Sequence, residues 1–88
     1  MDIIKLLDNL EVGIPLVVTT TWQDLVNREV TLYGGKNDEG IYNFITIDTT
    51  FGMTPRYIKE HCTISQELDQ DTDLYEVVKI CNKVKGVK

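Results

Sequence analysis

Hydrophobic residues recur with the period of an α-helix only near the two ends of this chain of 88 residues. Over residues 2–12 the apolar side chains follow the i, i+3, i+4, i+7 spacing of one helical face, and residues 73–85 repeat that spacing. Asp2 is suited to cap the first helix, and Gly13 followed by Pro15 is suited to end it. We therefore predict two amphipathic helices with a region of different structure between them.

The region between the helices, about residues 15–65, is typical of β-structure because it is rich in β-branched residues. Strands are predicted at 16–20, 29–33, 41–48 and 61–65. In the strand at 29–33 we expect Val30 and Leu32 to face inward and Thr31 and Tyr33 to face outward.

Glycine and proline mark the predicted connections of this region. Residues 34–40 contain three glycines and predict the turn of a hairpin that spans 29–48. Residues 49–53 are predicted to be a second connection, and Thr54-Pro55 predicts a helix start with proline in the first turn. For residues 21–27 we favour a loop that contains one helical turn. The alternative is a strand that continues to Trp22, followed by an irregular loop.

These elements predict one α+β domain over residues 1–88, because a chain of this length holds a single hydrophobic core. We expect a small, bent antiparallel sheet or an SH3-like barrel, with an N-terminal and a C-terminal helix. The alternative is a two-layer sheet with both helices on one face.

The segment Gly52-Met53-Thr54-Pro55-Arg56-Tyr57 resembles the end of an SH3 domain, where Gly, Pro and Tyr bracket a 3₁₀ turn before the last strand. The order of a leading helix and then strands is also similar to the Sm-like barrel, which binds RNA as a ring. The resemblance covers about residues 14–65 and implies a small barrel.

The formal net charge of −5 disfavours nucleic acid as the partner, since phosphate neutralisation supplies most of the affinity of such binders. No apolar run approaches the length of a membrane span, and residues 1–11 lack the basic start of a signal peptide. We therefore expect a cytoplasmic protein without a membrane partner. The absence of alanine, with plentiful Ile, Lys, Asn, Asp and Thr, suits an AT-rich coding sequence of a low-GC bacterium or its phage.

The chain offers few residues for catalysis or metal binding. His61 and Ser65 are its only histidine and serine, and Cys62 and Cys81 are its only cysteines. The run from Asp69 to Asp73 has the first acids of a calcium-binding EF-hand loop but lacks the glycine and glutamate that the loop needs later. We predict no catalytic residue, no cofactor and no metal.

Two groups of residues are candidates for contact with a partner. Aromatic side chains in or beside the predicted strand connections combine a large apolar area with a polar group. The acidic stretch 67–76 contains no basic residue. The candidates are Trp22, Tyr33, Tyr42, Phe51 and Tyr57 from the aromatic group and Asp69, Asp71 and Asp73 from the acidic group.

The sequence thus favours a small, acidic, non-catalytic binding protein, such as an inhibitor or accessory module of a phage or mobile element. Its expected partner is another protein. A more specific hypothesis is a basic nucleic-acid-binding protein that the acidic stretch would occlude. One alternative is a nucleic-acid-binding module of the Sm-like or SH3-like type that uses the lysines of residues 79–88. A remote alternative is an enzyme that uses Cys62 or His61. A homodimer through an edge strand is also compatible with the pattern.

Overall fold

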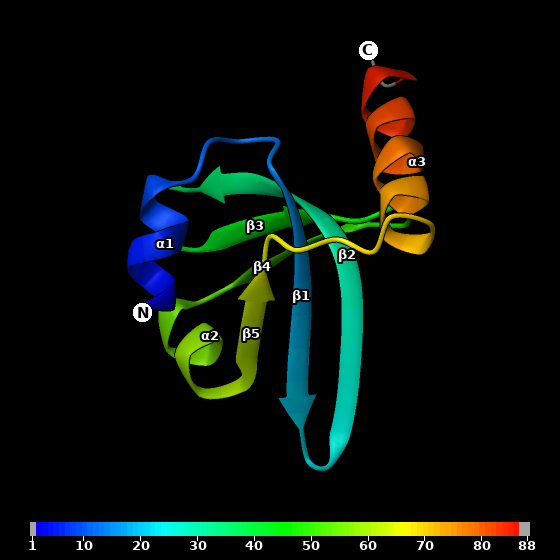
Figure 1. The fold of residues 1–88 in the computed structure, drawn as a ribbon. Coiled ribbons are helices and arrows are strands. Elements are labelled where there is room, and N and C mark those ends of the chain that lie inside the picture. Colours follow the sequence, from blue (N-terminus) through cyan, green and yellow to red (C-terminus); the bar gives the residue numbers. More distant parts are fainter. Residues whose placement is uncertain (1, 87–88) are drawn as a thin grey trace.

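The structure is a computed structural model that describes residues 2–86. Within this range three helices accompany a five-stranded antiparallel sheet with the order β4-β3-β2-β1-β5 (Figure 1). The elements are α1 (Ile3–Asn9), β1 (Pro15–Trp22), β2 (Leu25–Lys36), β3 (Tyr42–Ile45), β4 (Thr50–Met53), α2 (Pro55–His61), β5 (Cys62–Ser65) and α3 (Thr72–Gly86). The predicted α+β class, with a bent antiparallel sheet and a helix near each end, is confirmed. The sheet is open, with β4 and β5 at its edges.

Helix α1 begins as predicted and ends earlier than predicted. The Asp2 side chain accepts a hydrogen bond from the Ile4 amide at 3.0 Å, which satisfies a free N–H of the first turn. The helix stops at Asn9, because the chain beyond it already pairs with β2. The Gly13 amide donates to the Tyr33 carbonyl at 2.7 Å, and the Tyr33 amide donates to the Ile14 carbonyl at 2.9 Å.

The prediction of a loop with a helical turn over residues 21–27 is wrong. Strand β1 continues to Trp22, and Trp22 pairs directly with Leu25, so that only two residues form the turn. Gln23 and Asp24 have φ angles of 50° and 69°. Two consecutive positive φ angles are the signature of the two-residue hairpin turn whose twist matches that of the strands. The β1–β2 hairpin therefore extends beyond the rest of the sheet (Figure 1).

Glycines bend β2 where a turn was predicted. Gly34 and Gly35 belong to the strand, whose register with β3 shifts between Tyr33 and Gly35. Gly35 has φ +89°, and a Cβ atom on Gly34 would lie 3.2 Å from the backbone of Asn43. A bulge of this kind bends a strand and increases its twist. Residues 49–53, predicted to be a connection, contain β4, which pairs with β3 and brings Phe51 opposite Phe44.

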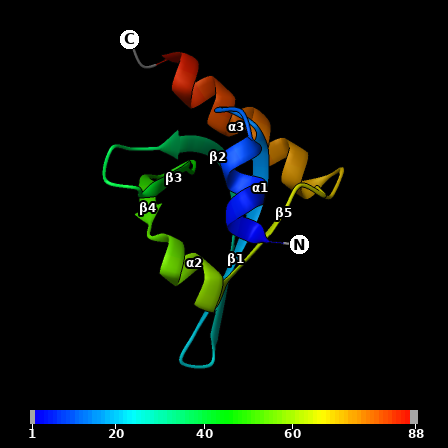
Figure 2. The same cartoon turned by 90° about the vertical axis from the view of Figure 1, so that its left-hand side faces the viewer.

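Both faces of the sheet are covered. The core packs on one face, where α1 and α2 lie, and α3 lies against β2 from the other side (Figure 2). The core residues are Leu7, Leu16, Val18, Tyr33, Tyr42, Phe44, Met53 and Ile58. The prediction that Thr31 and Tyr33 face outward is wrong, because both are buried together with Leu32 on the opposite face. Because the terminal helices lie on opposite sides, the alternative with both helices on one face does not apply.

The segment after β4 forms as the sequence predicts, with a longer helix. Thr54 caps α2 by accepting a hydrogen bond from the Tyr57 amide at 3.2 Å, and Pro55 occupies the first turn. The helix continues to His61, and β5 then pairs antiparallel with β1, with Cys62 opposite Thr20. Helix α2 thus crosses from one edge of the sheet to the other and lies beside the opening between β4 and β1.

Candidate functional site

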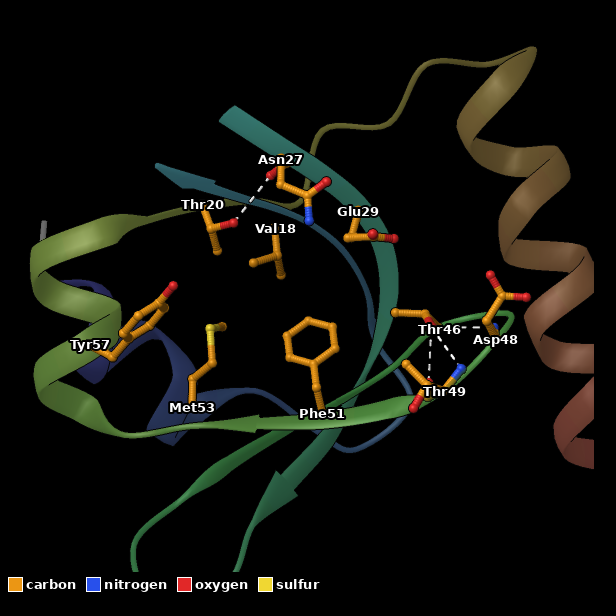
Figure 3. A pocket seen from close by; sticks show the side chains of 10 residues that line it. All are labelled: Val18, Thr20, Asn27, Glu29, Thr46, Asp48, Thr49, Phe51, Met53 and Tyr57. Atoms are coloured by element: carbon orange, nitrogen blue, oxygen red, sulfur yellow. Dashed lines mark hydrogen bonds between the residues drawn. The ribbon is translucent and has the colours of Figure 1, made fainter. Parts of the chain in front are cut away.

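A pocket of about 340 Å³ lies on the core face of the bent sheet, beside α2 (Figure 3). Strands β1, β2 and β4, helix α2 and the turn between β3 and β4 form its walls. It is lined by Val18, Thr20, Asn27, Glu29, Thr46, Asp48, Thr49, Phe51, Met53 and Tyr57. The pocket exists because β4 and β1 are not paired, so that the face between them stays partly uncovered.

The floor of the pocket is apolar and is part of the core. Val18 and Met53 are buried. The half-buried Phe51 ring stacks on Phe44, with ring centroids 5.5 Å apart and an angle of 27° between the planes. Strand alternation places these residues, because Val18, Phe44 and Met53 point to the same face of their strands. This floor offers a partner side chain a fixed apolar surface.

The walls of the pocket are polar and carry two carboxylates. Thr20, Asn27 and Glu29 follow one another across the β1–β2 pair on the face of Val18, because Thr20 pairs with Asn27 and Val18 with Glu29. Glu29 is half-buried, and within residues 2–86 neither Glu29 nor Asp48 forms an ion pair. Among the described residues, those that line the pocket include no lysine, arginine or histidine. The pocket therefore combines an apolar floor with two carboxylates that form no ion pair within residues 2–86.

The turn that carries Asp48 is held by the buried Thr46 hydroxyl. This oxygen accepts hydrogen bonds from the amides of Asp48 at 3.3 Å and Thr49 at 3.0 Å, and it donates to the Thr49 carbonyl at 2.9 Å. A threonine side chain that bonds to the next backbone groups favours a tight turn. Asp48 therefore lies at one end of the pocket on a fixed backbone, with Tyr57 at the other end (Figure 3).

Tyr57 also joins the pocket to an aromatic cluster at the end of the β1–β2 hairpin. The Trp22 ring lies 4.6 Å from His61 edge to face and 6.1 Å from Tyr57. The Tyr57 and His61 centroids are 5.0 Å apart. Trp22 remains 48% exposed. The structure thus brings three of the predicted contact aromatics, namely Trp22, Phe51 and Tyr57, to one side of the molecule.

The two other predicted aromatics lie in the core. Tyr33 and Tyr42 are buried, and the Tyr42 hydroxyl donates a hydrogen bond of 2.5 Å to Asp8 of α1. Burial, together with the adjacent Asp8 carboxylate, raises the pKa of Tyr42 to about 12. The hydrogen bond from Tyr42, with Lys36 nearby, lowers the pKa of Asp8. These rings hold α1 on the sheet and present no free face to a partner.

The acidic stretch has a mainly structural part in the fold. Asp73 is 1% exposed, forms an ion pair with Arg28 of β2, and accepts a hydrogen bond from the Asp69 amide at 2.8 Å. The Arg28 guanidinium, and next the Asp69 amide, lower the pKa of Asp73. Asp69 accepts hydrogen bonds from the amides of Asp71 at 2.9 Å and Thr72 at 3.0 Å. Of the three candidate aspartates, only Asp71 has an exposed carboxylate without such a task.

Cys62 and His61, the two residues considered for catalysis, pack against apolar and aromatic neighbours. Cys62 lies at the start of β5 against the Met53 sulfur, and burial raises the pKa of its thiol to about 11, so the thiol stays protonated at neutral pH. Cys62 and Cys81 are both free cysteines. His61 packs between Trp22 and Tyr57. Among residues 2–86, no three side chains of the types that bind metals converge.

The lysines of α3 are partly engaged within the molecule. Lys79 lies 3.9 Å from Glu76, and Lys83 donates a hydrogen bond of 3.2 Å to the Thr46 carbonyl. These contacts use two of the cations on which the nucleic-acid alternative depends.

Comparison with protein-family models, curated proteins and solved structures gave no match in any of the three. In the part of the chain that the structure describes, no helix has the length and apolar character needed to cross a membrane. The proposed function therefore rests on the geometry of the pocket.

Sequence reasoning missed Glu29, Asn27 and Asp48 as site residues. Asn27 and Glu29 stand two positions apart, which places them on one face of a strand. That signal was hidden because residues 21–27 were predicted to be a loop. No sequence signal places Asp48 near Asn27 and Glu29, since the bend of β2 brings the turn of Asp48 towards these two residues.

Proposed function

We propose that this protein is a non-catalytic binding module whose pocket takes a segment of another protein, with a basic side chain beside an apolar one. The half-buried Glu29 carries this proposal, since it has no ion-pair partner within residues 2–86 and stands over an apolar floor. A bound ammonium or guanidinium group can pair with this carboxylate, and charge-assisted hydrogen bonds of this kind are stronger than neutral ones.

The size of the pocket supports a side chain as its occupant. A volume of about 340 Å³ lies at the lower limit of pockets that enclose small molecules. It suits one or two side chains of a bound segment. The exposed ring of Trp22 continues the surface beyond Tyr57, and an exposed tryptophan next to a pocket is typical of the residues that dominate binding energy.

The charges of the protein support a basic protein segment over nucleic acid. The net charge is −5, and the pocket-lining residues that the structure describes include no basic one. A phosphate backbone would meet Glu29 and Asp48 with like charge. The same carboxylates attract a lysine or arginine of a partner and increase the rate of encounter.

Affinity capture with a tagged protein tests this proposal if matched variants are used. The double variant Glu29→Gln/Asp48→Asn removes the charge of the pocket with almost no change of shape. The control Asp38→Asn/Glu39→Gln removes the same charge from the exposed turn after β2. Each protein is used with and without nuclease, and the bound proteins are identified by mass spectrometry.

We expect a partner that withstands nuclease, binds the wild type and the control, and is at least tenfold depleted with Glu29→Gln/Asp48→Asn. This factor corresponds to about 1.4 kcal/mol of binding free energy. Partners that disappear with nuclease would overturn the proposal in favour of nucleic acid. Equal capture by all three proteins would show that the pocket is not the binding surface.

A further inference from the structure

Helix α3 has an apolar face that no other part of the described chain covers. Leu74, Tyr75 and Val78 are 43%, 55% and 58% exposed. They line a shallow groove together with Asp71, Lys79 and Asn82. Figure 2 shows α3 crossing the sheet on the side opposite to α1 and α2, so that this groove lies on the outside of the molecule.

The other face of α3 fixes the helix on its own sheet. Ile80 is fully buried, and Asp73 is held by Arg28 of β2. Because these contacts set the rotation of the helix about its axis, the exposure of Leu74 and Val78 is a fixed property of the fold. A stripe of exposed apolar side chains on a fixed helix is a surface for association.

Two residues of opposite charge, Asp71 and Lys85, lie at equal sequence distances from Val78. Asp71 precedes Val78 by the same seven positions by which Lys85 follows it, and Leu74 and Asn82 stand four positions on either side. Steps of three and four residues keep Leu74, Val78, Asn82 and Lys85 on one side of the helix, and Asp71, in the turn before α3, lines the same groove as Leu74 and Val78. Asp71 therefore lies towards one end of the stripe and Lys85 towards the other, with Val78 in the middle and Lys79 beside it.

We propose that α3 of one molecule pairs with α3 of a second copy in antiparallel orientation, with the two-fold axis at Val78. In this register Val78 meets Val78 of the partner molecule, and each Asp71 meets a Lys85. A two-fold axis requires a self-complementary surface, and a stripe with opposite charges at equal distances from its centre fulfils that condition.

Parallel pairing of the same stripes is disfavoured. It would place Asp71 against a second Asp71 and Lys85 against a second Lys85, and like charges across an interface are destabilising. It would also align the two helix dipoles, whereas antiparallel helices place the positive end of one beside the negative end of the other. The exposed charges thus select the direction, and the apolar side chains supply most of the association energy.

A single helix pair is a small interface, so we expect a weak and reversible dimer. Sedimentation equilibrium over a range of protein concentration measures it directly. We expect the average mass of the wild type to rise from that of a monomer towards that of a dimer with concentration. We expect Val78→Asp to remain monomeric, because it places two carboxylates on the axis. Leu25→Asp is the matched control, because it adds the same charge at the hairpin end, where Leu25 is 72% exposed.

A charge exchange tests the register. Asp71→Lys and Lys85→Glu should each weaken the dimer several-fold, because each leaves two like-charged contacts. The double variant Asp71→Lys/Lys85→Glu should restore wild-type association, since opposite charges meet again. Asp38→Lys controls for the change in net charge, because Asp38 is exposed in the turn after β2. Circular dichroism verifies that each variant is folded.

Three results would overturn the proposal. One is a wild-type mass that stays monomeric up to millimolar concentration. Another is a dimer that survives Val78→Asp, which would place the interface elsewhere, for example at an edge strand. The third is a double exchange that associates no better than its single variants. None of these results bears on peptide binding in the pocket, so the two proposals fail independently.

Discussion

The two faces of the sheet are stabilised by different kinds of contact. On the face that carries α1 and α2, eight buried residues form one apolar core, with Leu7, Leu16, Phe44 and Ile58 fully buried. On the other face, α3 contributes Ile80 as its fully buried apolar residue and Asp73 as a buried charge. The first face depends on one large apolar cluster, whereas the second combines a smaller number of buried apolar residues, among them Val17, Leu32 and Ile80, with one ion pair.

This difference explains where the molecule exposes its apolar surface. The face of α1 and α2 encloses its large side chains and opens at the pocket between β4 and β1. The second face is covered by one helix that uses a narrow stripe for docking and leaves Leu74 and Val78 in solvent. A sheet that is covered unequally on its two sides therefore offers two distinct surfaces, a pocket and a helix stripe.

The largest expected effect comes from a cavity in the core. Leu16→Ala should lower the free energy of unfolding by about 3 to 5 kcal/mol, because Leu16 is fully buried among large side chains. Ile80→Ala should cost about 2 kcal/mol, at the low end of the range for such changes, because α3 can shift towards the gap. Urea unfolding followed by circular dichroism measures both. Equal losses, or a larger loss for Ile80→Ala, would contradict the difference between the faces.

Acid should weaken the docking of α3. The pKa of Asp73 is lowered in the folded protein, so its carboxylate stabilises the fold above the ordinary value of 3.8, and this contribution is lost as the pH falls through the folded pKa. Asp73→Asn should therefore be less stable than the wild type at pH 7, and the difference should shrink below pH 4. Urea midpoints at pH 7, 5 and 3 provide the test. A constant difference would show that Arg28 and Asp73 do not act as a charged pair.

Alkali should act on the other face through Tyr42. Its pKa is raised from 10.0 to about 12, so the protonated hydroxyl stabilises the fold below pH 10, and this contribution is lost between pH 10 and 12. The gap in stability between the wild type and Tyr42→Phe should narrow over that interval. Part of the loss of stability at alkaline pH should persist in Tyr42→Phe, because burial also raises the pKa of Tyr33 and Cys62. A difference in stability between the two proteins that does not change with pH would show that ionisation of the Tyr42 hydroxyl does not affect the stability of the fold.

The smallest expected effect concerns the β1–β2 turn, which belongs to neither face. Asp24 has φ 69°, a conformation that costs an ordinary residue about 1 to 2 kcal/mol and glycine almost nothing. Because glycine is also more flexible in the unfolded chain, Asp24→Gly should raise the free energy of unfolding by only about 0.5 kcal/mol. Thr21→Gly, at a strand position of the same hairpin, should be destabilising. A loss of stability with Asp24→Gly would contradict the two-residue turn.

Local patterns predicted the elements whose signals lie within a few residues. The helix starts at Asp2 and Thr54, the helix of residues 73–85 and the short strand at 61–65 are confirmed. The turn at Gln23-Asp24 escaped prediction because neither residue is a glycine or asparagine. The strand at 50–53 escaped it because its pairing with β3 is a tertiary contact.

The site was less predictable than the fold for a related reason. Trp22, Phe51 and Tyr57 share one side of the molecule because β2 bends at Gly34 and Gly35, and that bend is not encoded near any of the three. Tyr33 and Tyr42 lie in or beside predicted strand connections, as Tyr57 does, but the structure places both of them in the core. The acidic stretch was predicted to be available to a partner. Asp73 of that stretch is instead buried, where it forms an ion pair with Arg28 of β2.

We propose that the pocket recognises a basic side chain beside an apolar one. Selection of a displayed library of random peptides against the immobilised protein tests it most directly, with Glu29→Gln/Asp48→Asn selected in parallel and Asp38→Asn/Glu39→Gln as control. We expect the wild type and the control to enrich peptides with lysine or arginine next to an apolar residue, and the pocket variant to lose this enrichment. Enrichment of acidic or uncharged peptides, or of the same basic peptides by all three proteins, would contradict it.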